Sequence, residues 1–257
     1  MQFRLINSGK LSPAMNMAID EALLDGPQPV LRFYQWQPAG ISIGFFQKMK
    51  EEINIAECKK QGIGYVRRLT GGKAVLHDME LTYSIILDEK TMPKSIIESY
   101  KIISQGILIA LEKLGFKAQM KESLEKKPSS SICFNESSYY EIIVGNKKIV
   151  GSAQTRKKGK LLQHGSVLID IDINKLCSLF NSDSEQTRKE TGKRITSLKK
   201  ELRREITFEE VAEAMTFGFQ TNFECEFRID NLTKQEFLLA EKLAEKKYST
   251  DEWNFMR

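Results

Sequence analysis

The stretch RRLTGGKAVLH, residues 67 to 77, narrows the fold and the site more than any other part of the sequence. It places Arg67 and Arg68 before the pair Gly71 and Gly72, and it ends on His77. β-rich runs flank the glycines, so a plain hairpin turn with positive φ fits the pattern. The same bare backbone would also let a ligand oxygen approach main-chain amides, with an arginine nearby for an anion. Because the stretch is neither a GxxxxGK[ST] loop nor the opening of a helix, it predicts a ligand-contacting hairpin and not a nucleotide fingerprint.

A second cluster lies in GNKKIVGSAQTRKKGKLLQHGSVL, residues 145 to 168. Small residues follow the lysines at 147 and 148 and allow a substrate to approach closely, and a lysine in an apolar site holds a carbonyl or carboxylate oxygen. A basic surface hairpin explains most of the other cations. Upstream, Cys133 follows hydroxyl-bearing residues. A buried inert thiol is the ordinary role for such a cysteine, and a nucleophile would need a cation or base beside it. The other residues singled out are Gly151, Ser152, Ala153, His164 and Gly165.

Helix and strand patterns surround both clusters. Residues 12–26 predict a helix capped by Ser12, residues 94–114 predict the longest helix, and capping boxes at Thr207 and Thr233 begin two more. Short β-rich runs begin at positions 30, 41, 64, 73 and 81, and a strand meander with a Gly-Asn turn covers residues 139–172. The polar segment 181–205 predicts a long mobile loop. Helices around hairpin-connected strands predict an α+β fold with a mixed, mainly antiparallel sheet.

Composition sets bounds and selects no activity. The chain has 257 residues, of which 41% are hydrophobic and 28% charged, as in an ordinary globular protein. A net charge of +5 does not require nucleic acid and fits an acidic protein partner equally well. The four cysteines show neither a CxxC pair nor metal-ligand spacing, which predicts reduced thiols in a cytoplasmic protein. No segment has the character of a signal peptide or a membrane span.

Taken together, several segments of the chain resemble the biotin/lipoate protein ligase superfamily, in its lipoate and octanoate branch. They run from residue 16 to residue 254, and their order is more specific than any one of them. The resemblance implies one catalytic domain over residues 1–257, with a mixed, mainly antiparallel sheet flanked by helices. The matching text is NMAIDEALL, RRLTGGKAVLHDMELTYSII, CFNESSYYEIIVGNKKIVGSAQTRKKGKLLQHGSVLIDID, ITSL and KYSTDEWN.

The resemblance also implies roles for individual residues. Members of the branch attach octanoyl or lipoyl groups to one lysine of an acceptor domain. By likeness, Gly71 and Gly72 line an acyl tunnel, and His77 sits at its mouth. Lys148 is the lysine of KIVGSA that grips the acyl carbonyl. The implied substrate-binding set is Arg68, Gly71, Gly72, His77, Gly151, Ser152, Ala153, His164 and Gly165, and a structural role for His164 fits as well.

Two chemistries share this framework, and both are kept. Cys133 stands where cysteine-dependent octanoyltransferases of the LipM type carry their nucleophile, which favours octanoyl transfer from acyl carrier protein through a thioester, with no cofactor. Many ATP-dependent lipoate ligases continue beyond the DEWN segment into a small accessory domain. The alternative is such a ligase, which would need ATP and Mg²⁺. The expected acceptor is a lipoyl domain or the glycine cleavage H protein, with no nucleic acid, membrane or metal. Basic residues that could steer such acidic partners are Lys157, Lys158, Lys160, Lys199, Lys200, Arg203 and Arg204.

Overall fold

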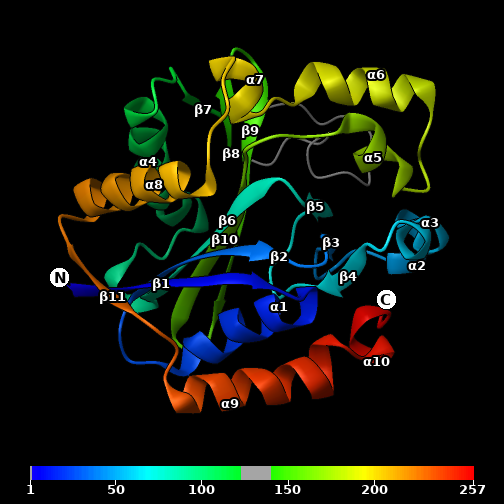
Figure 1. Ribbon diagram of the computed structural model, residues 1–257. Helices are drawn as coiled ribbons and strands as arrows, with labels where there is room; N and C mark the ends of the chain where they lie inside the picture. The colour runs from blue at the N-terminus through cyan, green and yellow to red at the C-terminus, as the bar shows by residue number, and fades with distance from the viewer. Residues whose placement is uncertain (1, 123–139) are drawn as a thin grey trace.

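A large mixed sheet forms the centre of the protein (Figure 1), in a computed structural model that describes residues 2–122 and 140–257. Its eight strands run in the order β11-β1-β2-β6-β10-β9-β8-β7. β1 pairs in parallel with β11 and β2, and every other neighbouring pair is antiparallel. The predicted fold class is therefore confirmed. The strands are β1 (Gln2–Leu11), β2 (Val30–Trp36), β6 (Glu80–Asp88), β7 (Gln119–Glu122), β8 (Tyr140–Val144), β9 (Lys147–Lys157), β10 (Lys160–Leu168) and β11 (Glu226–Asp230).

A second, three-stranded sheet contains the RRLTGG stretch. It consists of β3 (Gly40–Ile43), β4 (Gly64–Arg67) and β5 (Val75–His77), with β3 in the middle. β4 is parallel to β3, and β5 is antiparallel to it. The predicted hairpin at Gly71 and Gly72 is wrong, because β3 lies between the two strands that those glycines connect. The glycines belong instead to a loop that crosses the end of β3.

Helices cover both faces of the large sheet. In Figure 1, α4 and α8 lie side by side on one face, and α1 and α9 lie together on the other. The small sheet is on the right of that view, beside α2 and α3. The helices are α1 (Pro13–Ala22), α2 (Met49–Glu52), α3 (Ile55–Lys60), α4 (Ile96–Lys113), α5 (Ile173–Ser178), α6 (Glu185–Arg194), α7 (Leu198–Leu202), α8 (Phe208–Phe223), α9 (Lys234–Leu243) and α10 (Asp251–Asn254), with short turns at Leu23–Asp25, Glu89–Thr91 and Ala244–Tyr248.

Three apolar clusters hold these layers together. The largest joins the sheet to α4 and α8, through side chains such as Tyr83, Ile107 and Phe219. A second packs α1 and Tyr248 against the opposite face, and a third fills the space around the small sheet. Burial of this surface supplies the main driving force for folding.

Local signals placed most helix starts correctly. The Ser12 side chain accepts a hydrogen bond from the Met15 amide at 3.2 Å, and both predicted capping boxes are present. The loop predicted for residues 181–205 is wrong, because α6 and α7 occupy it. Ser184 and Ser197 cap these helices, and buried Ile195 and Leu198 anchor them. Within residues 2–122 and 140–257, every helix is either too short or too polar to span a bilayer.

Candidate active site

A cavity of about 530 Å³ lies between the two sheets. The large sheet contributes side chains from β2, β6, β9 and β10, and the small sheet contributes side chains from β3 and β5. Cavities of this size, mainly apolar with a few placed polar groups, are typical ligand sites. The lining residues are Met17, Tyr34, Trp36, Ser42, Phe46, Gln47, Glu52, Arg68, Gly72, Lys73, Val75, His77, Thr82, Gly151, Ser152, Ala153, His164, Gly165 and Ser166.

The cavity has a buried inner end and an exposed mouth. Tyr34, Trp36 and Thr82 are almost completely buried and form the inner end. At the mouth, the Phe46 ring is 70% exposed and covers Gly71, whose added Cβ would lie 3.7 Å from the ring. One open end and one buried, largely aromatic end suit an elongated apolar ligand with a polar head.

Arg68 holds the glycine loop in place. Its Nη2 donates to the main-chain oxygens of Gly71 and Lys73 at 2.7 and 2.8 Å, and its Nη1 donates to the main-chain oxygen of Ser42 at 2.8 Å. Gly72 has φ +88°, and a Cβ at Gly44 would lie 1.9 Å from the Gly72 oxygen, so the loop requires glycine at both positions. Arg68 lines the cavity as predicted, but its donors are used to shape the loop.

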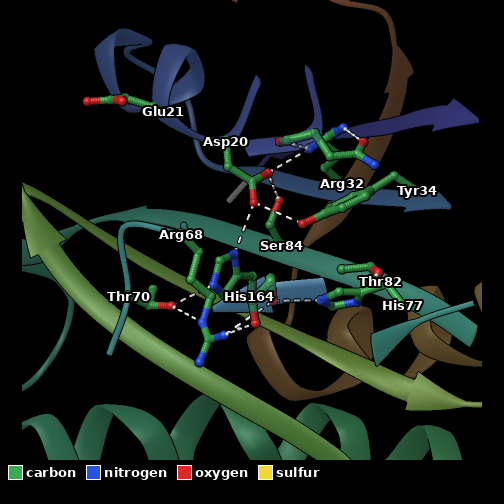
Figure 2. Close-up of polar contacts among 12 residues, drawn as sticks. Asp20, Glu21, Arg32, Tyr34, Arg68, Thr70, His77, Thr82, Ser84 and His164 are labelled. Carbon is green, nitrogen blue, oxygen red and sulfur yellow. Dashed lines mark hydrogen bonds and ion pairs between the residues drawn. The ribbon is translucent and has the colours of Figure 1, made fainter. Parts of the chain in front are cut away.

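Two histidines line the cavity, and both have carboxylate partners; Figure 2 shows the one of His164, which is Asp20. His77 Nδ1 lies 2.7 Å from Glu80 Oε1, and His164 Nδ1 lies 3.1 Å from Asp20 Oδ2. The His77 ring is stacked on Trp36, with centroids 4.0 Å apart. The resemblance placed His77 at the mouth of the tunnel. In the structure His77 lines the cavity, is buried and stacks on Trp36, and its place at the mouth stays a prediction.

Asp20 is the buried anion of this region. Figure 2 shows it facing Arg32, Tyr34, Ser84 and His164, while the neighbouring Glu21 points away. Arg32 Nη1 donates to Asp20 at 2.7 Å, with both side chains almost inaccessible to solvent. Burial alone would raise the pKa of Asp20, but the charge of Arg32 and the hydrogen bond from His164 outweigh it and lower that pKa. Burial also lowers the pKa of His164 below its usual 6.5, and this effect outweighs the hydrogen bond to Asp20, which raises it. At neutral pH, Asp20 is therefore a carboxylate and His164 an uncharged imidazole.

Lys148 is buried near the start of β9, three residues before Gly151. The pairing of β8 with β9 shifts register between Ile142 and Ile143, so Lys148 lies opposite Ile143. Consecutive Ile149 and Val150 both join the same apolar cluster, which shows that the usual alternation is broken here. Lys148 Nζ reaches Glu141 Oε1 at 2.9 Å. Lys148 is not among the described residues that line the cavity, and its catalytic role stays a prediction.

The structure brings together eight of the nine predicted substrate-binding residues: Arg68, Gly72, His77, Gly151, Ser152, Ala153, His164 and Gly165 all line the cavity. Gly71 lies beside Phe46 and is not in the described lining. Cys133 lies outside the described residues, so its role stays a prediction. The other three cysteines are buried, and burial raises the pKa of each thiol, to about 11 for Cys58.

Sequence reasoning missed the inner end of the cavity. Tyr34 and Trp36 alternate along the run VLRFYQW, a signal that both face one side of a strand. Asp20 was hidden inside a helix pattern, and Ser42, Thr82 and Ser166 carried no local signal. Within residues 2–122 and 140–257, no group of three or more His, Cys, Asp or Glu side chains could hold a metal ion.

The fold and the site define an α+β domain built around a mainly apolar cavity between two sheets, and comparison with known proteins gives its family. Residues 12–220 match the family described as "Lipoyl protein ligase A/B catalytic domain", and the chain belongs to it. It is similar to the protein named Octanoyltransferase LipM of Brevibacillus brevis, with 46% identity covering 100% of this chain and 99% of that relative. The Bacillus subtilis protein of the same name is 43% identical, over 99% and 98% of the two chains.

A solved structure supports the same family. The crystal structure of lipoate-protein ligase A bound with ATP superimposes with a TM-score of 0.84 at 31% identity and covers 99% of each chain. The family resemblance and the α+β fold expected from the sequence are therefore confirmed.

Proposed function

We propose that the protein transfers an octanoyl group from acyl carrier protein to one lysine of a lipoyl-acceptor protein. The observation that carries the proposal is similarity over nearly the full length of the chain to proteins named octanoyltransferase. The cavity supports it independently, because it is mainly apolar and its lining includes the buried aromatic side chains of Tyr34 and Trp36. The ATP-dependent ligase alternative is not favoured by these relatives.

The cavity suits a medium-length acyl chain. An octanoyl group has seven carbons beyond the carbonyl, and each buried methylene stabilises binding by about 0.8 kcal/mol, or roughly 5–6 kcal/mol in all. Tyr34, Trp36 and Val75 supply apolar contact surface along the cavity. The thioester would remain near the mouth, where a carrier arm can reach it. This arrangement puts the reacting carbonyl on the side of the exposed glycine loop.

The proposed reaction has two steps. The Cys133 thiolate attacks the thioester carbonyl, so a new S–C bond forms, the carrier's S–C bond breaks, and the carrier thiol leaves with a proton. The acceptor lysine then attacks the octanoyl-enzyme as a free amine, the N–C bond forms, the S–C bond to Cys133 breaks, and the proton that the amine loses passes to the departing sulfur. A buried ammonium at Lys148 would stabilise the thiolate and the developing oxyanion. No ATP is needed, because one thioester replaces another before the stable amide forms.

The cysteine inventory agrees with this assignment of the nucleophile. Cys58, Cys177 and Cys225 are buried, and their raised pKa values keep them as thiols at neutral pH. A thiol rather than a thiolate is a poor nucleophile. Cys133 is the remaining cysteine of the sequence.

The partners follow from the chemistry in part. An acyl donor and a lipoyl-domain acceptor are implied by the family, and we propose acyl carrier protein and a lipoyl domain or glycine cleavage H protein as the specific partners. Several cations expected to steer them are already paired within the protein. Lys157 contacts Glu21 at 2.8 Å, and Lys158 contacts Asp25 at 2.7 Å. Lys199 and Arg204 are likewise paired with Glu205 and Glu210. Their steering effect is therefore reduced.

A transfer assay tests the proposal. Purified protein is incubated with octanoyl acyl carrier protein and a lipoyl-domain acceptor without ATP, and the acceptor is weighed by intact mass spectrometry. We expect octanoylation by wild type and by Cys225→Ala, the matched buried-cysteine control, and none by Cys133→Ala. Labelling only with free lipoate, ATP and Mg²⁺ would show a ligase instead, and an unmodified acceptor under both conditions would overturn the enzymatic assignment.

A further inference from the structure

We propose that Arg68 is a positioning residue for acyl-chain selectivity, because it fixes the tautomers of both histidines at the cavity through two hydroxyl groups. The inference rests on the proposed function only for the identity of the acyl chain that the cavity selects. It starts from hydrogen bonds that converge on one guanidinium from two sides. We name the two series the His77 arm, which contains Ser42, His77 and Glu80, and the His164 arm, which contains Thr70, His164 and Asp20.

The His77 arm has one consistent direction of donation. Arg68 Nη1 donates to Ser42 Oγ at 3.2 Å, and Ser42 Oγ lies 2.7 Å from His77 Nε2. His77 Nδ1 lies 2.7 Å from the Glu80 carboxylate, which only accepts when ionised. With a neutral ring and an ionised Glu80, Nδ1 carries the ring proton, Nε2 accepts, and the Ser42 hydroxyl donates.

The His164 arm repeats the same logic with a different hydroxyl. Arg68 Nε donates to Thr70 Oγ1 at 3.0 Å, and Thr70 Oγ1 lies 2.7 Å from His164 Nε2. His164 Nδ1 lies 3.1 Å from the Asp20 carboxylate. Because a guanidinium has no acceptor, it orients both hydroxyls away from itself and onto the two Nε2 atoms. One cation thus orients the hydroxyl that supports the Nδ1-protonated form of each ring.

The charges of the region agree with neutral histidines. Asp20 and Glu80 carry two buried negative charges, and Arg32 and Arg68 carry two buried positive charges. A proton on either ring would add a further buried positive charge close to Arg68 and would require the hydroxyl at Nε2 to accept a second hydrogen bond instead of donating one. Each ring nitrogen already has a partner within the protein, so the arrangement favours the histidines as fixed, uncharged walls and not as proton shuttles.

The fixed rings determine the shape of the inner end. His77 is stacked on Trp36 with an interplanar angle of 9°, and Trp36 Nε1 donates to Thr82 Oγ1 at 2.8 Å. Thr82 in turn donates to Glu80, the carboxylate that holds His77. A change in the His77 tautomer would therefore disturb the indole that helps to form the inner end. Chain-length discrimination depends on that surface, where one methylene is worth about 10- to 200-fold.

Arg67 provides a matched control. It is adjacent to Arg68 and equally buried, but its guanidinium donates to main-chain oxygens, including those of Gly44, Gln47 and Asn254. Within the described part of the chain, its hydrogen bonds belong to neither the His77 arm nor the His164 arm. Replacement of Arg67 by lysine therefore tests the general effect of losing a buried guanidinium without cutting either arm.

The first measurement uses the apo protein and is independent of catalysis. The sequence contains only two histidines, so ¹⁵N-detected NMR of a tag-free protein reports two rings. At pH 7.5 we expect both rings neutral with the proton on Nδ1. Ser42→Ala should move only the His77 signals, Thr70→Val only the His164 signals, Arg68→Lys both, and Arg67→Lys neither. A wild-type ring that is charged or protonated on Nε2, or signals unmoved by all three arm variants, would overturn the proposal.

The second measurement is the ratio of kcat/KM for octanoyl over decanoyl carrier protein. Arg68→Lys and Ser42→Ala should lower this ratio by about tenfold, whereas Arg67→Lys should keep it within about twofold. An unchanged ratio in both arm variants would refute the role in selectivity. If wild type transfers no acyl group at all, the proposed function fails, and the NMR result decides the tautomer assignment separately. If Arg68→Lys does not fold, the two single-arm variants complete the test.

Discussion

Replacement of Asp20 by asparagine should strongly destabilise the protein. Asp20 accepts hydrogen bonds from Arg32 at 2.7 Å, Ser84 at 2.9 Å, Tyr34 at 3.0 Å and His164 at 3.1 Å. Asparagine has nearly the same shape, but it removes the negative charge that balances the fully buried Arg32. Its amide nitrogen would also point two N–H donors at groups that themselves donate to Asp20. Breaking a buried pair by removing one partner costs about 3–5 kcal/mol.

The effect can be measured by urea unfolding and by thermal melts. In a chain of this size each kcal/mol lowers Tm by about 2–4 °C, so a loss of roughly 6–20 °C is expected. Asp25→Asn is the matched control, because Asp25 and its partner Lys158 are each 45% exposed, and an exposed pair contributes about 0–1 kcal/mol. If Asp20→Asn lowers the free energy of unfolding by no more than Asp25→Asn does, the reasoning about the buried network is wrong.

Three further predictions concern the loop and the pH dependence of stability. Gly44→Ala should sharply lower the yield of folded protein or its Tm, because the new Cβ would lie 1.9 Å from the Gly72 oxygen. Gly192 lies in a helix with open space around it, so Gly192→Ala should raise the free energy of unfolding by up to about 1 kcal/mol. Because burial lowers the pKa of His164 below its usual 6.5, the unfolded chain binds the proton first, so the free energy of unfolding from urea curves should fall as pH drops below about 6.5. In Thr70→Val, where His164 Nε2 loses its hydroxyl partner, this fall should be smaller. Burial alone would raise the pKa of Glu21, but hydrogen bonds from Lys157, Lys247 and Tyr248 lower it from 4.5 to about 2. The contribution of Glu21 to the free energy of unfolding is therefore present above pH 4.5 and is lost as pH falls toward 2. In Glu21→Gln, the free energy of unfolding measured with urea should fall less steeply over this pH range, and an identical fall would contradict this reasoning.

Local sequence signals predicted most of the fold. Caps at Ser12, Thr207 and Thr233 act within three residues, so they could be recognised without the structure. The strand from Val30 to Trp36 was placed correctly by its β-branched and aromatic residues. The segment 181–205 was misjudged because its high charge suggested a mobile loop. Its helices depend on two serine caps and on a few buried side chains that only tertiary packing reveals.

The site was predictable only in outline. The glycines and histidines could be singled out by residue type and by resemblance, and most of them line one cavity. The hairpin at Gly71 failed because pairing with β3 is a long-range property. The arms of Arg68 join residues far apart in the chain, such as Thr70 with His164 and His164 with Asp20, and no local pattern encodes such contacts.

The central claim is that octanoyl transfer passes through a thioester on Cys133, and a single-turnover trapping experiment tests it most directly. The protein is mixed with octanoyl acyl carrier protein without acceptor, quenched in acid, digested and mapped by mass spectrometry. The account predicts one octanoyl group, labile to hydroxylamine, on the peptide that contains Cys133. A transfer-competent enzyme whose octanoyl group is found on another residue, or that never carries one, would contradict it.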